Sequence, residues 1–125
     1  MTPDRTTAKR RHAERQGRSG ETLAALVLRL KGYRILGRRV RTHVGEIDLV
    51  ARSPKGVLCF VEVKARPDMR ASIESVGDRQ RARIARAATA FVAGRPQLAQ
   101  APVRFDIVTV APRALPRHIR DAWRP

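Results

Sequence analysis

Apolar residues recur at helical spacing in the segment that follows residue 19. One face of an α-helix repeats at i, i+3, i+4 and i+7, and the residues at these positions are Leu23, Leu26, Val27 and Leu30. Ser19 is a candidate N-cap, and Glu21 would then lie in the first turn, where an acid suits the positive end of the helix dipole. The pattern predicts a helix that ends near Gly32 and that the rest of the chain covers well.

Three short runs with strand character follow, at residues 34–41, 45–52 and 57–65. Ser53-Pro54-Lys55-Gly56 separates the last two and is a strong turn signal, because Pro fixes φ and Gly accepts a positive φ. A second amphipathic helix begins near residue 76 and ends before Gly94 and Pro96, and a last strand at 103–110 precedes a Pro-rich tail from about residue 112. The order α-β-β-β-α-β predicts an α/β fold with a mixed sheet flanked by helices.

Length and charge limit the organisation of the chain. Its 125 residues are the length of one domain, and residues 1–18 are basic with almost nothing that could enter a core. We therefore expect a flexible basic arm at 1–18 and a single domain at 19–125. Lys and Arg number 27 and Asp and Glu 11, which gives a formal charge of +16. This excess indicates a polyanionic partner, with nucleic acid ahead of an anionic membrane surface.

The sequence contains no apolar run near the ~20 residues that span a bilayer. Its first residues lack the apolar stretch of a secretory signal, and Cys59 has no second cysteine with which to form a disulfide. We therefore expect a cytoplasmic protein without a membrane partner. A four-cysteine zinc site is excluded, so a metal site would have to use carboxylates.

Acidic residues are the informative minority of this basic chain. Successive strand residues point to opposite faces, so Glu46 shares a face with Asp48, and Glu62 shares one with Lys64. If the hairpin turns around Lys55, residues whose numbers sum to 110 face each other. Asp48 then lies opposite Glu62, and Glu46 lies opposite Lys64.

Two carboxylates placed opposite each other destabilise a sheet. A shared divalent cation relieves the repulsion between Asp48 and Glu62, and so does a raised pKa on one carboxyl group. A third explanation is a solvated sheet face whose charges form ordinary salt bridges. For Glu21, the helix dipole accounts for an acid at that position without any role in a site. These alternatives stay open at the level of the residues.

Several motifs lie along residues 19–123, and GEIDLV and FVEVKAR at this separation are specific as a pair. The motif residues are Gly20-Glu21, Ala24, Leu28, Gly32-Tyr33-Arg34-Ile35-Leu36, Arg41, Gly45-Glu46-Ile47-Asp48-Leu49-Val50, Phe60-Val61-Glu62-Val63-Lys64-Ala65-Arg66 and Arg104-Phe105-Asp106-Ile107-Val108. Together they resemble a known family, the YraN-type bacterial proteins. The family is expected to have a restriction-endonuclease-like fold and is related to archaeal Holliday-junction resolvases.

The resemblance implies the PD-(D/E)xK arrangement of catalytic residues. Asp48 would be the first strand carboxylate, and Glu62 and Lys64 would be the acid and the lysine of the ExK element. Glu21 matches the helix acid that often completes the metal site, so Mg²⁺ or Mn²⁺ would be held by Asp48, Glu62 and Glu21. Gln80 stands where the family usually has a lysine.

The implied function is a metal-dependent DNA endonuclease, with branched DNA such as Holliday junctions as a candidate substrate. Resolvases of this fold tend to be symmetric dimers, so the resemblance is compatible with a homodimer. The alternative is a non-catalytic nucleic-acid-binding protein that retains the fold. DNA is favoured over RNA because the few aromatic residues sit mostly in core patterns. The expected contacts to nucleic acid are Arg10, Arg11, Arg41, Arg66, Arg79, Arg83 and Arg86.

Overall fold

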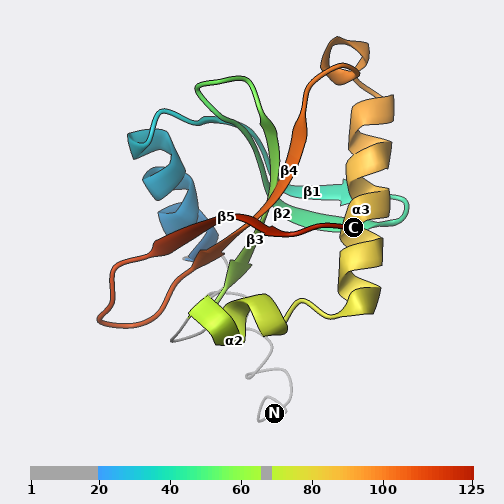
Figure 1. Ribbon diagram of the computed structural model, residues 1–125. Helices are drawn as coiled ribbons and strands as arrows, with labels where there is room; N and C mark the ends of the chain where they lie inside the picture. Colours follow the sequence, from blue (N-terminus) through green and yellow to red (C-terminus); the bar gives the residue numbers. More distant parts are fainter. Residues whose placement is uncertain (1–19, 66–68) are drawn as a thin grey trace, which may run out of the picture.

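A five-stranded sheet with helices on both faces makes up the fold, as the computed structural model in Figure 1 shows. The structure describes residues 20–65 and 69–125. The expected basic arm and Arg10, Arg11 and Arg66 lie outside these residues. The elements are a helix at 20–30 (the N-terminal helix), β1 (Arg34–Thr42), β2 (Gly45–Arg52), β3 (Leu58–Lys64), α2 (Met69–Glu74), α3 (Asp78–Ala93), the 3-10 turn η1 (Pro96–Leu98), β4 (Val103–Thr109) and β5 (Arg117–Trp123).

The strands lie in the order of the sequence, β1-β2-β3-β4-β5. Neighbours are antiparallel except β3 and β4, which run parallel because the chain between them crosses over through α2 and α3. Gly56 has a φ of +88° in the turn between β2 and β3, a conformation that glycine adopts without a steric penalty. The predicted α/β class with a mixed sheet between helices is therefore confirmed.

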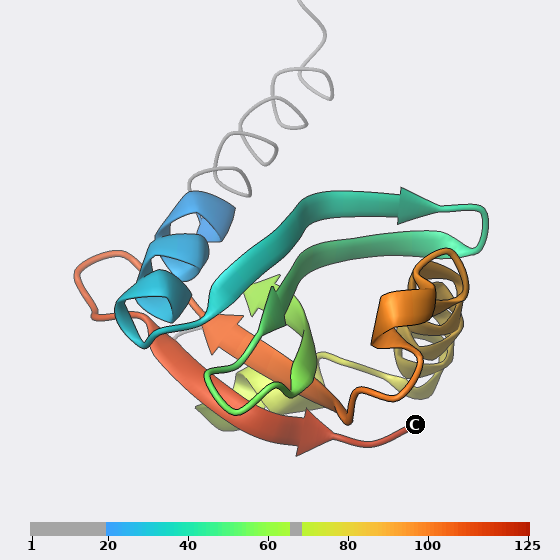
Figure 2. The ribbon, with the colours of Figure 1, turned by 90° about the horizontal axis from the view of Figure 1, so that it is seen from above.

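Each face of the sheet has its own core. The N-terminal helix packs on one face through Ala24, Ala25 and Leu28, against strand residues such as Leu49 and Val61. On the opposite face, α3 packs against the sheet, and its buried residues are Ile84, Ala87, Ala88 and Phe91. Figure 2 shows the two helices on opposite sides of the sheet, with the tip of the β1–β2 hairpin beside α3.

The N-terminal helix turns a different face inward from the one that its leucines predict. Leu23, Leu26 and Leu30 are exposed, Leu30 by 79%, whereas Ala24, Ala25 and Leu28 are almost wholly buried. The small alanine side chains let the helix backbone lie close to the sheet. A Cβ added to Gly20 would come within 3.0 Å of Val110, which shows how tight this approach is. The expected good coverage of the helix therefore holds on the alanine face only.

Besides the short turn η1, two elements have no counterpart in the order predicted from the sequence. α2 is a short helix of six residues. Residues 117–123, in the segment expected to be a Pro-rich tail, form β5 at the edge of the sheet. Only Ile119 and Trp123 of β5 enter the core, so its apolar pattern is too sparse to indicate a strand. None of the helices in residues 20–65 and 69–125 is long and apolar enough to cross a membrane.

Candidate functional site

Asp48 on β2 and Glu62 on β3 lie on the two neighbouring strands of the central hairpin. The pairs Leu49↔Val61 and Val50↔Phe60 have residue numbers that sum to 110, so the predicted register is confirmed. Asp48 and Glu62 come next along the two strands, and the backbone N–H of Val63 donates to Asp48 Oδ2 at 2.8 Å. Each carboxyl group acts on the pKa of the other, which places the two groups in direct interaction.

Glu62 is an unusually placed acid. Its exposed fraction is 6%, and Oε1 is one of two buried side-chain polar atoms without a hydrogen-bond partner in the described chain, the other being Trp123 Nε1. Burial, and after it the charge of Asp48, raises the pKa of Glu62 to about 9. Burial also raises the pKa of Asp48. The pair therefore resists carrying two negative charges when no cation is present.

Lys64 follows Glu62 by two residues, and its charge favours ionisation of both acids. Its Nζ donates to Oε1 of Gln80, on the first turn of α3, at 3.3 Å. The predicted pairing of Lys64 with Glu46 is wrong. Glu46 instead pairs with Arg41, which faces it in the β1–β2 register, with 3.5 Å between Arg41 Nε and Glu46 Oε2.

Glu21 does not join the two strand acids in one cluster. It is buried in the first turn of the described part of the N-terminal helix, and its Oε2 accepts a hydrogen bond from Arg39 Nε at 2.8 Å. Within residues 20–65 and 69–125, no three Asp, Glu, His or Cys side chains are placed to hold one metal ion. The structure thus brings Asp48, Glu62 and Lys64 together and pairs Glu21 with an arginine.

The expected basic contacts lie partly around this site. Arg79, Arg83 and Arg86 are exposed on α3, and Arg41 is exposed near the end of β1. The stem of Arg83 packs on Gly45 at the hairpin tip, where an added Cβ would come within 2.8 Å of Arg83 Cγ. Arg83 is therefore held next to the strand that carries Asp48.

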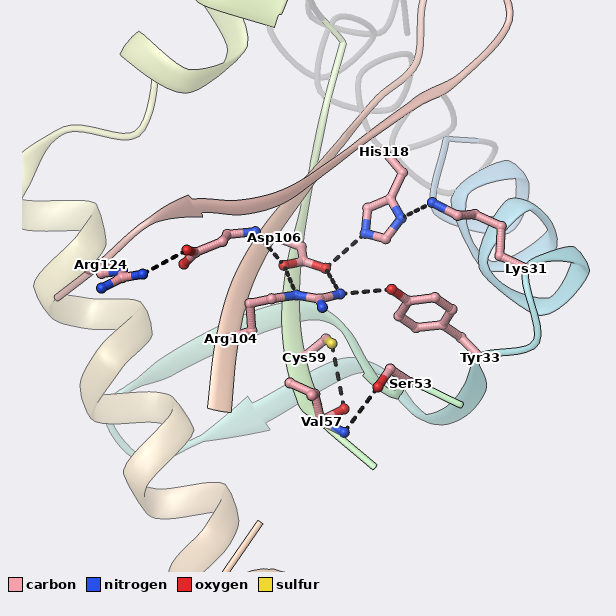
Figure 3. A network of polar contacts seen from close by, with 10 residues as sticks. Lys31, Tyr33, Ser53, Val57, Cys59, Arg104, Asp106, His118 and Arg124 are labelled. Carbon is pink, nitrogen blue, oxygen red and sulfur yellow. Dashed lines mark hydrogen bonds and ion pairs between the residues drawn. The ribbon is translucent and has the colours of Figure 1, made fainter. Parts of the chain in front are cut away.

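A further buried acid, Asp106 on β4, lies at the centre of a network of polar contacts (Figure 3). Arg104 donates to both of its carboxylate oxygens, at 2.8 and 2.9 Å, and the backbone N–H of Asp121 donates to Oδ1 at 3.0 Å. His118 Nε2 lies 2.7 Å from Oδ2. Arg104 also donates to the hydroxyl of Tyr33 at 2.7 Å.

These partners explain how a fully buried acid is tolerated. Burial by itself raises the pKa of Asp106, but the hydrogen bonds from His118, Arg104 and the Asp121 backbone outweigh it and leave the pKa lowered. Sequence analysis named Asp106 as part of a motif that carries the family resemblance. It missed His118, because that residue comes from the unpredicted strand β5.

Comparison with known proteins identifies the family. Residues 20–110 match the family described as "Uncharacterised protein family UPF0102". The chain belongs to this family. A UPF0102 protein of Paramagnetospirillum magneticum is 54% identical, with 90% of this chain and 89% of the relative covered. A family member from Agrobacterium fabrum is 46% identical over 98% of this chain and 100% of its own length. The matched region includes Glu21, Asp48, Glu62 and Lys64, and the resemblance to the YraN-type family is confirmed.

Proposed function

We propose that this protein is a divalent-metal-dependent phosphodiesterase that cleaves DNA. One observation carries the proposal: Asp48 and Glu62 are interacting carboxylates next to the last residue pair of two adjacent strands, and one buried oxygen of Glu62 has no partner. Burial and mutual repulsion make the doubly ionised pair unfavourable, and the charge of Lys64 offsets this only in part. A cation bound between the two carboxylates would compensate them.

The oxygens at this position suit Mg²⁺ or Mn²⁺. Both are hard cations that bind carboxylate oxygens and keep several positions for water and phosphate oxygens. Asp48 and Glu62 would hold the ion, and the unpartnered Oε1 of Glu62 is an oxygen that the fold leaves available. When bound, such an ion polarises a phosphate and lowers the pKa of a water molecule.

Lys64 and the neighbouring arginines would act on the DNA. Lys64 lies beside the acid pair and is held by Gln80, so its ammonium group can stabilise the negative charge that develops on the phosphoryl oxygens. Arg41, Arg79, Arg83 and Arg86 are exposed and would contact the phosphate backbone. Such contacts are independent of sequence and weaken steeply with salt.

One observation favours a second function, which is DNA binding without cleavage. Glu21 is paired with Arg39, so the acids present two carboxylates rather than three to a cation. A protein with an incomplete site would keep the basic surface and lose turnover. The test of the proposal therefore has to separate binding from cleavage.

The experiment compares four-way-junction DNA, linear DNA and RNA as substrates of the full chain, with Mg²⁺ or Mn²⁺. We expect metal-dependent cleavage of DNA that Asp48→Asn lowers by roughly 100-fold or more, because the cation loses a ligand. Glu46→Gln is the matched control, since Glu46 is an acid of the same strand that pairs with Arg41. It should cleave within a few-fold of the wild type.

Three results would decide against the proposal. Cleavage that persists in Asp48→Asn would place the activity elsewhere or in a contaminant. Tight, salt-sensitive binding of DNA by the wild type without cleavage would establish the second function. Preferential binding of RNA in direct competition would contradict the choice of DNA.

A further inference from the structure

Arg39 is on β1, so it lies next to Asp48 and on the opposite side of β2 from Glu62. On β1 it stands between Arg38 and Val40, which pair with Leu49 and Ile47, the two neighbours of Asp48. Its φ is +48°, a left-handed conformation that is unfavourable for a residue with a Cβ. The backbone therefore departs from regular strand geometry at Arg39, the residue that faces Asp48.

The guanidinium group of Arg39 interacts with three acids. Its hydrogen bond to Glu21 is the main cause of its raised pKa, and the charges of Glu21, Glu46 and Asp48 raise the pKa further. Glu21 is almost wholly buried, whereas the side chain of Arg39 is 33% exposed. A positive charge thus already stands among the acids, between the helix that carries Glu21 and the strand that carries Asp48.

A divalent cation at this site and the guanidinium of Arg39 would both be attracted to the same carboxylates. The two cations repel each other, and the hydrogen bond of Arg39 occupies Oε2 of Glu21, which weakens this carboxylate as a metal ligand. We propose that Arg39 competes with the divalent cation for the carboxylates of Glu21 and Asp48, and so keeps the metal affinity of the protein low. This inference rests on the proposed role of Asp48 and Glu62 as metal ligands.

A purely structural role for Arg39 makes a different prediction. Arg39 would then only neutralise Glu21, and its removal would weaken metal binding by disturbing the neighbouring strands. Competition predicts the opposite sign, because removing the guanidinium lowers the repulsion at Asp48 and frees a third carboxylate. The sign of the change in metal affinity therefore separates the two roles.

The experiment is isothermal titration of the full, folded chain with Mn²⁺. We expect Arg39→Gln to bind Mn²⁺ roughly tenfold more tightly than the wild type, a moderate effect because the arginine is partly exposed. Arg38→Gln is the matched control. It removes the same charge one residue away, from an arginine that donates to the hydroxyl of Thr22 at 2.7 Å, and its Mn²⁺ affinity should stay near that of the wild type.

A second variant guards against misfolding, since Arg39→Gln leaves Glu21 buried without its arginine. The double variant Arg39→Gln with Glu21→Gln removes both charges of the ion pair. It should still bind Mn²⁺ more tightly than the wild type, because the repulsion at Asp48 is gone, but less tightly than Arg39→Gln, which retains Glu21. Circular dichroism confirms that each variant keeps the secondary structure of the wild type.

Each outcome has one meaning. Tighter Mn²⁺ binding in both Arg39 variants supports competition. Unchanged or weaker binding, with the wild type binding Mn²⁺ through Asp48, overturns the competition and leaves the proposed function intact. No binding of Mn²⁺ by any variant overturns both. Binding by the double variant below that of the wild type shows that Glu21 is already a ligand beside Arg39, which also overturns the competition.

Discussion

Asp106 and Glu62 are both buried acids on neighbouring strands, yet their surroundings are opposite. Asp106 meets an arginine, a histidine and a backbone N–H, and its pKa is lowered. Glu62 meets another acid, has one oxygen without a partner, and has a raised pKa. Both side chains are removed from water, so burial alone does not account for the difference.

The comparison separates an acid whose partners the fold supplies from an acid whose partners the fold does not supply. The fold supplies every partner of Asp106, and the ionised carboxylate contributes to stability. At Glu62 the fold supplies like charge and burial, so the ionised form costs stability unless something from solution binds there. Sites that bind cations are expected to show the second pattern.

The largest expected effect is on the Asp106 network. Asp106→Ala leaves the charge of Arg104 without its partner in a largely buried position, and we expect a loss of about 3–5 kcal/mol of unfolding free energy. Urea denaturation followed by circular dichroism measures this loss. A change below about 1 kcal/mol would remove the structural half of the comparison.

Glu62→Gln should act in the opposite direction. The amide cannot ionise and can donate to Asp48, so we expect the metal-free protein to gain about 1–3 kcal/mol of unfolding free energy near neutral pH. The same urea experiment, with metal removed by a chelator, measures the gain. A loss of stability in Glu62→Gln would show that the charged pair is itself stabilising.

The pH dependence of stability should also differ in sign between the two acids. Because the pKa of Glu62 is raised from about 4.5 to about 9, the metal-free folded state holds a proton that the unfolded state has lost. Stability therefore falls as pH rises through that window, by up to about 1.4 kcal/mol per pH unit, and Glu62→Gln should remove this slope. The lowered pKa of Asp106 has the opposite consequence. Its carboxylate stabilises the folded protein fully when the pH is above the ordinary pKa of an aspartate, and this stabilisation is lost as the pH falls through the folded-state pKa.

Thermal melts between pH 6 and 9 in the absence of metal, compared for the wild type and Glu62→Gln, check this prediction. The gap between the two melting temperatures should widen with pH, since the variant lacks the titrating group. A gap that stays constant across this range would show that Glu62 does not titrate there.

The smallest expected effect concerns the residue that holds Lys64. Gln80→Ala removes the hydrogen bond to Lys64 and should change stability by less than about 0.5 kcal/mol, because the contact is partly exposed. DNA cleavage should fall by roughly up to tenfold as Lys64 loses its orientation. Thr89→Ala is the control for loss of a side chain from α3, because Thr89 is exposed and its hydroxyl donates to the carbonyl oxygen of Ala85 in the same helix. Equal cleavage by Gln80→Ala and the wild type would remove Gln80 from the site.

The opposed acids could be predicted from the sequence because a strong turn fixed the hairpin. Pro54 and Gly56 set the turn, and the two-residue period of strands then placed Asp48 opposite Glu62. The same arithmetic failed for Glu46, since it ignored the strand on the other side. Arg41 reaches Glu46 from β1, and Lys64 turns to Gln80 on α3.

The pattern of apolar and polar residues could not predict features that depend on three-dimensional packing. Helical periodicity favoured the leucine face of the N-terminal helix, but the close approach to the sheet selected the smaller alanines. Neither the pairing of Glu21 with Arg39 nor the left-handed backbone of Arg39 has a local signal in the sequence. β5 was not predicted because only two of its residues, Ile119 and Trp123, are both apolar and buried.

The central proposal is that a bound divalent cation balances the charges of Asp48 and Glu62, whereas the protein itself supplies the partners of Asp106. Anomalous diffraction from crystals soaked in Mn²⁺ tests it most directly. The account predicts one manganese peak in contact with the carboxylates of Asp48 and Glu62, lost in Glu62→Gln, and none at Asp106. Manganese bound elsewhere in the crystal, with no peak between Asp48 and Glu62, would contradict it.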